Sequence, residues 1–408
     1  MSKPPADIAP ADRIKPAAWM RWRETADVMA AITAGGAAAR FVGGCVRDTV
    51  LKRPVKDVDI ATTATPETIL KLLGDAGITA VPTGIDHGTV TAVAGKKHFE
   101  ITTLRVDVET FGRHATVAYT EDWAADAARR DFTMNALFLD ADGAVFDPVG
   151  GLTDLRAGHV RFVGDPTERI QEDYLRVMRF FRFHAHYGSG DMDAPGLAAC
   201  RDQAANIARL SVERVREELL RLLSAKNPLT TLRTMTEAGV LAVALPEGAD
   251  LDRLAGLVAV DTEVEPLRRL MALLPSDQAT LAAFATRLKL SRAQSGRLEA
   301  SVPPLPAAGL SKPEARALIY RVGQAAFRDR TLLAWAAQPA SKKFEPLLAL
   351  ADTWKNPSFP LRGADLLDLG VPSGPRVGEI MRDVEEWWIA GGFKAGRDAC
   401  LKQARSRL

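Results

Sequence analysis

The chain has 408 residues, of which 47% are hydrophobic and 25% charged, and its 53 Lys+Arg nearly balance its 51 Asp+Glu. This composition is typical of a soluble globular protein and excludes a largely disordered chain, while the length predicts more than one domain. No apolar run reaches the ~18 residues that a bilayer span needs, so we expect no membrane segment. With a net charge of only +2, a polyanionic partner must be recognised by local clusters of basic residues.

The first residues and the cysteines indicate the cellular setting. Residues 1 to about 16 are rich in Pro, Ala and charge, which predicts a mobile arm without the apolar segment of a secretory signal. Cys45, Cys200 and Cys400 are odd in number and far apart. This spacing favours a reducing cytoplasm and argues against a disulfide framework or a disulfide-linked partner.

The character of the chain changes near residue 155. Before it, a helix over 17–32 is followed by short β-type runs and by a second helix, 66–74, with Thr65 as its N-cap. The predicted strands are 40–42, 58–61, 89–93, 98–103 and 136–139. Beyond it, helical spacing covers 168–187, 197–208, 212–224, 228–238, 251–258, 266–274, 278–288, 293–302, 313–322, 324–335, 342–350, 377–389 and 398–407. The sequence therefore predicts an α+β fold, a mixed head followed by an all-helical remainder.

Two aspartates on one predicted strand form the first candidate site. Side chains alternate along a strand, so Asp57 and Asp59 share one face, about 7 Å apart, while Val58 and Ile60 face the core. Paired carboxylates suit Mg²⁺ held together with waters and substrate phosphates. An exposed acidic face is the ordinary alternative for such a pair.

Glycines and arginines accompany the aspartates. Gly43-Gly44 follows a short predicted strand and precedes Arg47; a glycine turn presents backbone N–H groups to an anion, and arginine grips phosphate bidentately. Further on, Arg129-Arg130-Asp131 combines groups that could hold a triphosphate and a ribose hydroxyl. A tight turn and a solvated helix end are the alternatives.

A helix rich in arginine and phenylalanine is the third feature. At 100° per residue, Glu172, Arg176 and Arg179 lie within about 60° of one another, with Asp173 on the flank. Apolar residues cover much of the remaining circumference. Salt bridges on a solvated helix face would explain the pattern equally well.

Taken together, these stretches resemble the class II CCA-adding tRNA nucleotidyltransferase and bacterial poly(A) polymerase family. The resemblance is carried by motifs in one order: Gly43-Gly44-Cys45-Val46-Arg47-Asp48 with Asp57-Val58-Asp59, Arg129-Arg130-Asp131-Phe132-Thr133 with Asn135-Ala136, Asp147-Pro148-Val149-Gly150-Gly151, Glu172-Asp173 with Arg176, and Leu210-Ser211 with Glu213-Arg214. It is strong over roughly residues 38 to 225 and weaker over 361–378.

The resemblance implies a domain order and a set of functional residues. The expected order is an N-terminal arm and helix (1–37), a small polymerase-beta-like nucleotidyltransferase head with a mixed sheet (38–155), a helical neck carrying a nucleotide-template helix (156–225), a helical body (226–340) and a helical tail (341–408). The implied residues are Asp57 and Asp59 for catalytic Mg²⁺, and Gly44, Arg47, Arg130, Asp131, Asp173, Arg176, Arg179 and Arg182 for the nucleotide. Glu100 is a candidate third carboxylate, with Asp131 as the alternative, and 100–114 resembles the family's strand and flexible loop.

Base choice also follows from hydrogen-bond chemistry. Ionised aspartate only accepts and arginine only donates, so a template made of Asp173 and Arg176 accepts the donor–acceptor edge of C and A. The same pair repels the reversed edge of U and G. We therefore expect an enzyme that adds CCA to tRNA from CTP and ATP. The alternatives are a poly(A) polymerase, a CC-only or A-only enzyme, and a tRNA-binding protein without catalysis.

Overall fold

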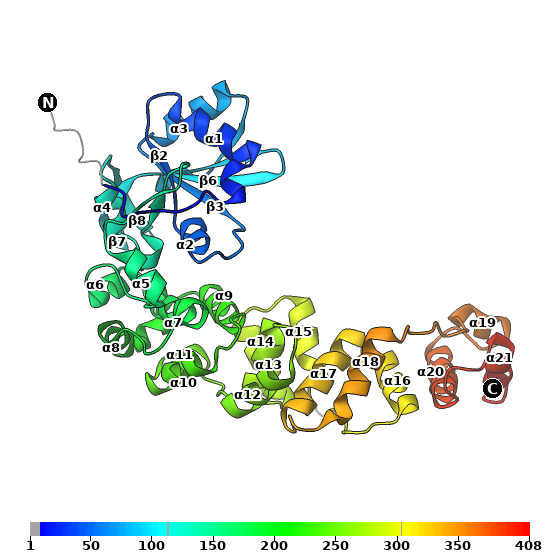
Figure 1. The fold of residues 1–408 in the computed structure, drawn as a ribbon. Helices are drawn as coiled ribbons and strands as arrows, with labels where there is room; N and C mark the ends of the chain where they lie inside the picture. Colours follow the sequence, from blue (N-terminus) through cyan, green and yellow to red (C-terminus); the bar gives the residue numbers. More distant parts are fainter. Residues whose placement is uncertain (1–8, 112–113, 303) are drawn as a thin grey trace. The chain divides into compact units, whose positions relative to one another are not determined.

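The computed structural model describes residues 9–111, 114–302 and 304–408. The chain divides into two compact units, Met1–Pro246 and Glu247–Leu408 (Figure 1).

The first unit begins with a mixed eight-stranded sheet. Its strand order is β1-β10-β9-β2-β3-β6-β5-β4, in which β3 and β6 are parallel and the other pairs antiparallel. The strands are β1 (Asp12–Arg13), β2 (Ala39–Val42), β3 (Val58–Thr62), β4 (Thr79–Gly84), β5 (Thr89–Ala94), β6 (Lys97–Thr103), β9 (Phe138–Leu139) and β10 (Ala144–Phe146). Strands β7 (Arg105–Phe111) and β8 (His114–Tyr119) form a separate antiparallel pair.

Alternation along β3 separates the core from the candidate site. Val58 and Ile60 are buried, whereas Asp59 between them is partly exposed, as the pattern predicts. Helices α1 (Arg23–Thr33) and α3 (Pro66–Asp75) pack against each other, and α3 also packs on β4, β5 and β6 (Figure 1). Thr65 caps α3 by accepting from the Thr68 N–H at 3.4 Å, which confirms the predicted cap.

The predicted arm is wrong in its described part. Asp12 and Arg13 form β1, which pairs with β10, and their side chains form ion pairs with Arg156 and Asp142. A two-residue strand has no periodicity of its own, so only its pairing with a distant strand reveals it. The stretch 100–114, expected as strand and flexible loop, includes the end of β6, all of β7 and the first residue of β8; positions 112–113 lie outside the described residues.

More helices complete the first unit. They are α4 (Trp123–Ala128), α5 (Gly151–Ala157), α6 (Pro166–Glu172), α7 (Leu175–Tyr187), α8 (Ala194–Asp202), α9 (Val212–Leu223), α10 (Leu229–Glu237) and α11 (Val240–Ala244), with 3-10 turns at Thr133–Asn135 and Ala204–Arg209. Phe132 of the head packs against Phe162 and against Phe183 of α7, at ring-centroid distances of 4.8 and 5.0 Å. This aromatic contact fixes α7 against the head.

The predicted continuous helix over 168–187 is wrong at Asp173. The backbone there is extended (φ −154°, ψ 106°), so α6 ends at Glu172 and α7 begins at Leu175. The Asp173 carboxylate accepts from the Leu175 N–H at 3.1 Å, and aspartate favours such capping positions. Helical periodicity on both sides concealed the break.

The described part of the second unit is helical throughout. Its helices are α12 (Leu251–Val260), α13 (Pro266–Leu273), α14 (Gln278–Arg287), α15 (Arg292–Glu299), α16 (Lys312–Val322), α17 (Gln324–Ala336), α18 (Glu345–Thr353), α19 (Gly363–Asp368), α20 (Pro375–Ala390) and α21 (Arg397–Arg405), with a 3-10 turn at Lys342–Phe344. None of the described helices in either unit combines the length and apolar character needed to cross a membrane.

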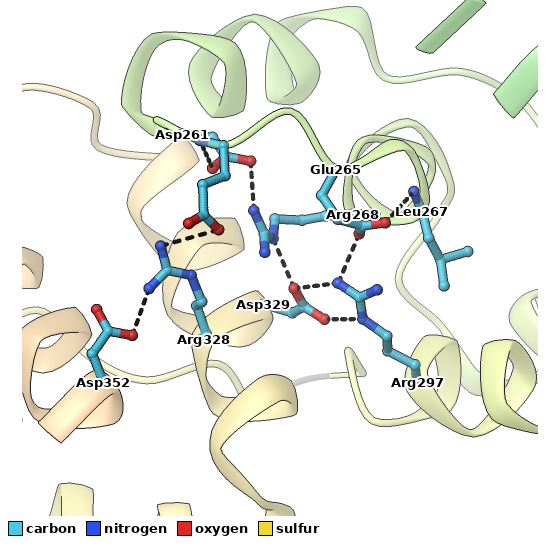
Figure 2. A network of polar contacts seen from close by, with 9 residues as sticks. Asp261, Glu265, Leu267, Arg268, Arg297, Arg328, Asp329 and Asp352 are labelled. Atoms are coloured by element: carbon cyan, nitrogen blue, oxygen red, sulfur yellow. Dashed lines mark hydrogen bonds and ion pairs between the residues drawn. The ribbon is translucent and has the colours of Figure 1, made fainter. Parts of the chain in front are cut away.

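A charged network lies inside this helical unit. Figure 2 shows the Asp329 carboxylate between Arg268 and Arg297, which donate to it from Nε at 2.7 and 2.5 Å. Arg268 also donates to Asp261 at 2.7 Å, and Arg297 to Glu265 at 2.7 Å. The network thereby joins α13, α15 and α17.

Candidate functional site

Two adjoining pockets in the first unit contain most of the predicted site residues. We call them the arginine pocket, of about 410 Å³, and the carboxylate pocket, of about 470 Å³. Gly44 and Arg47 line both. The arginine pocket is also lined by Gly43, Arg129, Arg130, Asp131, Asn135, Asp173, Leu175, Arg176, Arg179, Phe183 and Arg214. The carboxylate pocket is also lined by Cys45, Asp48, Arg53, Pro54, Val55, Lys56, Asp57, Asp59 and Tyr187.

Strand β3 places the two predicted carboxylates on one wall. Asp59 lies in β3 and Asp57 just before it, and Glu100 of β6 is the register partner of Asp59. Burial and the neighbouring charge of Glu100 raise the pKa of Asp59 to about 6, with a smaller contribution from Asp57 and partial opposition from Arg130. Negative charge is thus concentrated at this wall.

This wall suits a hard divalent cation. All its donors are carboxylate oxygens, the ligands that such cations prefer, and a cation would relieve the repulsion that raises the pKa of Asp59. Among the described residues no group of three or more His, Cys, Asp and Glu side chains is close enough to hold a metal. Asp57 and Asp59 are the two carboxylates of this wall that also line the carboxylate pocket.

A glycine turn and Arg47 join the two pockets. Gly43 has φ 71°, which favours glycine, and α2 (Gly44–Val50) starts directly after it. Arg47 donates from Nη1 to Asn135 Oδ1 at 2.8 Å and from Nε to Asp48 at 3.1 Å, and its guanidinium lies 4.2 Å from the Tyr187 ring centroid. These contacts fix Arg47 between the pockets.

Asp131 binds Arg179 on the neck side of the arginine pocket. The carboxylate accepts from Arg179 Nε at 2.8 Å and from Asn135 Nδ2 at 3.0 Å. Burial by itself would raise the pKa of Asp131, but the charge of Arg179 and these hydrogen bonds outweigh it and lower the pKa to about 2. Asp131 is therefore held ionised by protein partners.

Asp173 and Arg176 line the same pocket but have separate partners. Asp173 accepts from Arg214 Nη2 of α9 at 2.6 Å. Arg176 donates to Glu172 at 2.5 Å and to the Arg169 carbonyl at 2.8 Å. The break between α6 and α7 thus directs both side chains at one cavity.

Not every expected residue lines a pocket, and some lining residues were not expected. Arg182 donates to the buried Glu218 at 2.5 Å, and it is absent from the lining of the arginine pocket. Arg214 was noticed only as part of a motif, although it pairs with Asp173. Asp126 forms ion pairs with Arg129 and Arg130. The sequence could have indicated these pairs, because residues three and four positions apart on a helix are neighbours.

Comparisons with known proteins agree with this architecture. The family model of the poly A polymerase head domain matches residues 39–161, and the model "probable RNA and SrmB-binding site of polymerase A" matches 192–251. The CCA tRNA nucleotidyltransferase 1, mitochondrial, of Mus musculus is 34% identical over 377 residues, covering 89% of this chain and 85% of that protein. The CCA-adding enzyme of Limosilactobacillus fermentum is 32% identical, covering 93% and 96%.

Among solved structures, the Bacillus stearothermophilus CCA-adding enzyme in complex with CTP aligns with a TM-score of 0.75 and 26% identity, covering 94% of this chain and 97% of that one. The fold, the order of the motifs and the sequence similarity over most of both chains therefore agree. On these grounds the chain belongs to the class II family of CCA-adding tRNA nucleotidyltransferases and bacterial poly(A) polymerases.

Proposed function

We propose that this protein is a CCA-adding tRNA nucleotidyltransferase, which adds C, C and A to tRNA 3′ ends from CTP and ATP without a nucleic-acid template. The terminal 3′-hydroxyl attacks the α-phosphate of the incoming nucleotide, and pyrophosphate leaves. The full-length relatives are named for this activity, and the structural relative at 26% identity is described in complex with CTP. The alternative of a tRNA-binding protein without catalysis is disfavoured, because Asp57 and Asp59 are both present in the carboxylate pocket.

The observation that carries this proposal is the junction of the two pockets. Gly44 and Arg47 line both, so one nucleotide can have its base in the arginine pocket and its phosphates beside Asp57 and Asp59. Arg47 and Arg130 then neutralise phosphate charge and orient the α-phosphate. The base lies on the side where Asp173 and Arg176 are found.

We assign Mg²⁺ to Asp57 and Asp59. When bound, it supplies charge stabilisation to the attacking and leaving oxygens. Arg47 and Arg130 hold the triphosphate in place, and their positive charges stabilise the negative charge that develops on the leaving pyrophosphate.

One experiment separates CCA addition from its closest rival. Transcripts of one tRNA ending before the first C, after C-C and after C-C-A are incubated with CTP, ATP or both, and their 3′ ends are sequenced. We expect C-C from CTP alone, A only after C-C, and no extension of the complete end. Long runs of A would indicate a poly(A) polymerase, and an arrest after C-C with both nucleotides present would indicate a CC-only enzyme.

Base selection by Asp173 gives a second expectation. In Asp173→Ala, the preference for CTP over UTP and for ATP over GTP should fall roughly tenfold to a hundredfold, because a hydrogen bond to a charged group contributes ~1.5–3 kcal/mol. Incorporation of each nucleotide is measured at matched tRNA concentrations. Asp165→Ala is the matched control, since Asp165 caps α6 and is absent from the lining of both pockets. Unchanged ratios in Asp173→Ala would move the template role elsewhere.

Glu100, the candidate third carboxylate, lies beside Asp59 in the sheet but lines neither pocket, so we propose that it acts through its charge. If it assists the metal, Glu100→Gln should raise the Mg²⁺ concentration needed for half-maximal activity, because one charge beside Asp59 is lost. Activity is titrated against Mg²⁺ in the parent and the variant. An unchanged Mg²⁺ requirement would leave Asp57 and Asp59 as the protein ligands.

We also propose a cytoplasmic location, which the sequence's spaced, unpaired cysteines support. All three thiols are buried. Fractionation of cells with detection of the protein by antibody tests this location, and recovery in an organelle fraction would contradict it.

A further inference from the structure

Asp126 of α4 is a buried carboxylate that the proposed reaction does not explain by itself. Its side chain is only 1% exposed. Oδ1 accepts from Arg129 at 2.9 Å (Nε) and 2.7 Å (Nη2), and Oδ2 accepts from Arg130 at 3.2 Å (Nε) and 2.8 Å (Nη2). Each oxygen thus meets one guanidinium in a two-pronged contact.

The carboxylate remains charged although it is buried. Burial alone would raise the pKa of Asp126, but the charges of Arg130 and Arg129 and their hydrogen bonds outweigh burial and lower it. A third contact ties the group to the neighbouring strand pair, since Oδ1 also accepts from the backbone N–H of Arg105, the first residue of β7, at 3.3 Å.

Asp126 binds Nε and Nη2 of Arg130, which leaves Nη1 on the side of Gly43 and Asp59. A Cβ placed on Gly43 would lie 3.9 Å from Arg130 Nη1 and 3.7 Å from Asp59 Oδ2. Arg130 also partly opposes the rise in the pKa of Asp59. The edge of Arg130 formed by Nε and Nη2 therefore contacts Asp126, while its Nη1 lies near Gly43, on the side of Asp59.

We propose that Asp126 is a positioning residue for nucleotide binding: it holds Arg129 and Arg130, which line the arginine pocket, and fixes Arg130 with its Nη1 on the side of the triphosphate. This inference rests on the proposed function. Arginine carries several rotatable bonds, and fixing it in advance removes an entropy cost that binding would otherwise carry. The effect should appear in nucleotide affinity and leave base choice unchanged.

The test compares steady-state kinetics of the full chain with those of Asp126→Asn. The amide removes the charge and turns an N–H₂ group toward one guanidinium, so we expect KM for both CTP and ATP to rise roughly tenfold or more. KM for tRNA and the CTP-to-UTP preference should stay at parent values. Asp122→Asn is the matched control: it removes the same charge at the N-cap of α4, where the Asp122 carboxylate accepts from the backbone N–H groups of Ala124 and Ala125.

The split between KM and kcat distinguishes positioning from a structural role. A merely structural role would lower the folded fraction and hence the apparent kcat, with nucleotide KM unchanged, and that result would overturn the proposal. Should Asp126→Asn not fold, Asp126→Glu decides. It keeps the charge but moves the carboxylate, so nucleotide KM should still rise, and a parent-like KM would overturn the proposal. An inactive parent enzyme would instead contradict the proposed function.

Discussion

Asp59→Ala should abolish nucleotide transfer while the protein stays folded. If Asp59 holds the metal as proposed, its loss removes several kcal/mol of transition-state stabilisation, so the rate should fall roughly a thousandfold or more. The fold should survive, because burial and Glu100 raise the pKa of Asp59 to about 6. A pKa raised above its unfolded value means that the residue adds stability at low pH and loses it as the pH rises through about 6.

The measurement pairs single-turnover incorporation from CTP with thermal unfolding in a metal chelator at pH 7.5. The unfolding temperature of Asp59→Ala should be equal to or higher than that of the parent. Asp75→Ala, at the exposed end of α3, serves as the control and should retain parent activity. Substantial Mg²⁺-dependent transfer by Asp59→Ala would contradict the assignment of this carboxylate.

Asp329→Ala should destabilise the helical unit by about 3–5 kcal/mol, because it leaves Arg268 and Arg297 inside the protein without their shared carboxylate. Asp329 is 1% exposed, and it contacts both guanidinium groups at 2.5 to 2.9 Å (Figure 2). Urea unfolding of the full chain, followed by circular dichroism, measures the change in the free energy of unfolding.

Asp352→Ala is the control for this experiment. Asp352 also pairs with an arginine, Arg328, at 2.8 Å, but its side chain is 58% exposed. Exposed pairs contribute less than ~1 kcal/mol, so the control should unfold almost as the parent does. Equal unfolding curves for the two variants would mean that α13, α15 and α17 hold together without the Asp329 network.

Most helices could be predicted because each buries one face, and the resulting spacing is visible within the element. The expectations 212–224, 251–258 and 324–335 correspond to α9, α12 and α17. The wrong predictions concern features that depend on contacts with residues outside the predicted element. Asp12 and Arg13 form a strand only because β10 lies beside them, and the break at Asp173 depends on one side chain capping the next turn.

The site shows the same division between local and distant information. Residue types and motif order predicted which residues gather, and Gly44, Arg47, Arg130, Asp131, Asp173, Arg176 and Arg179 do line one pocket. Their partners were not predictable, because the pairing of Asp173 with Arg214 depends on how α9 packs against α7. The resemblance implied Arg182 for the nucleotide, but its side chain binds Glu218 and does not line this pocket.

The partners of Asp173 and Arg176 have a consequence for how long a nucleotide stays. Since Arg214 and Glu172 already bind these two side chains, an arriving base replaces or shares contacts and adds few new ones. The net free energy of binding the base is then small, because the contacts that it gains are offset by the contacts with Arg214 and Glu172 that are lost or shared. In the proposed template, the hydrogen-bonding edge of U or G would still be repelled by Asp173 and Arg176. Under the proposed template role of Asp173 and Arg176, rejection of a wrong base thus does not require tight binding of the right one.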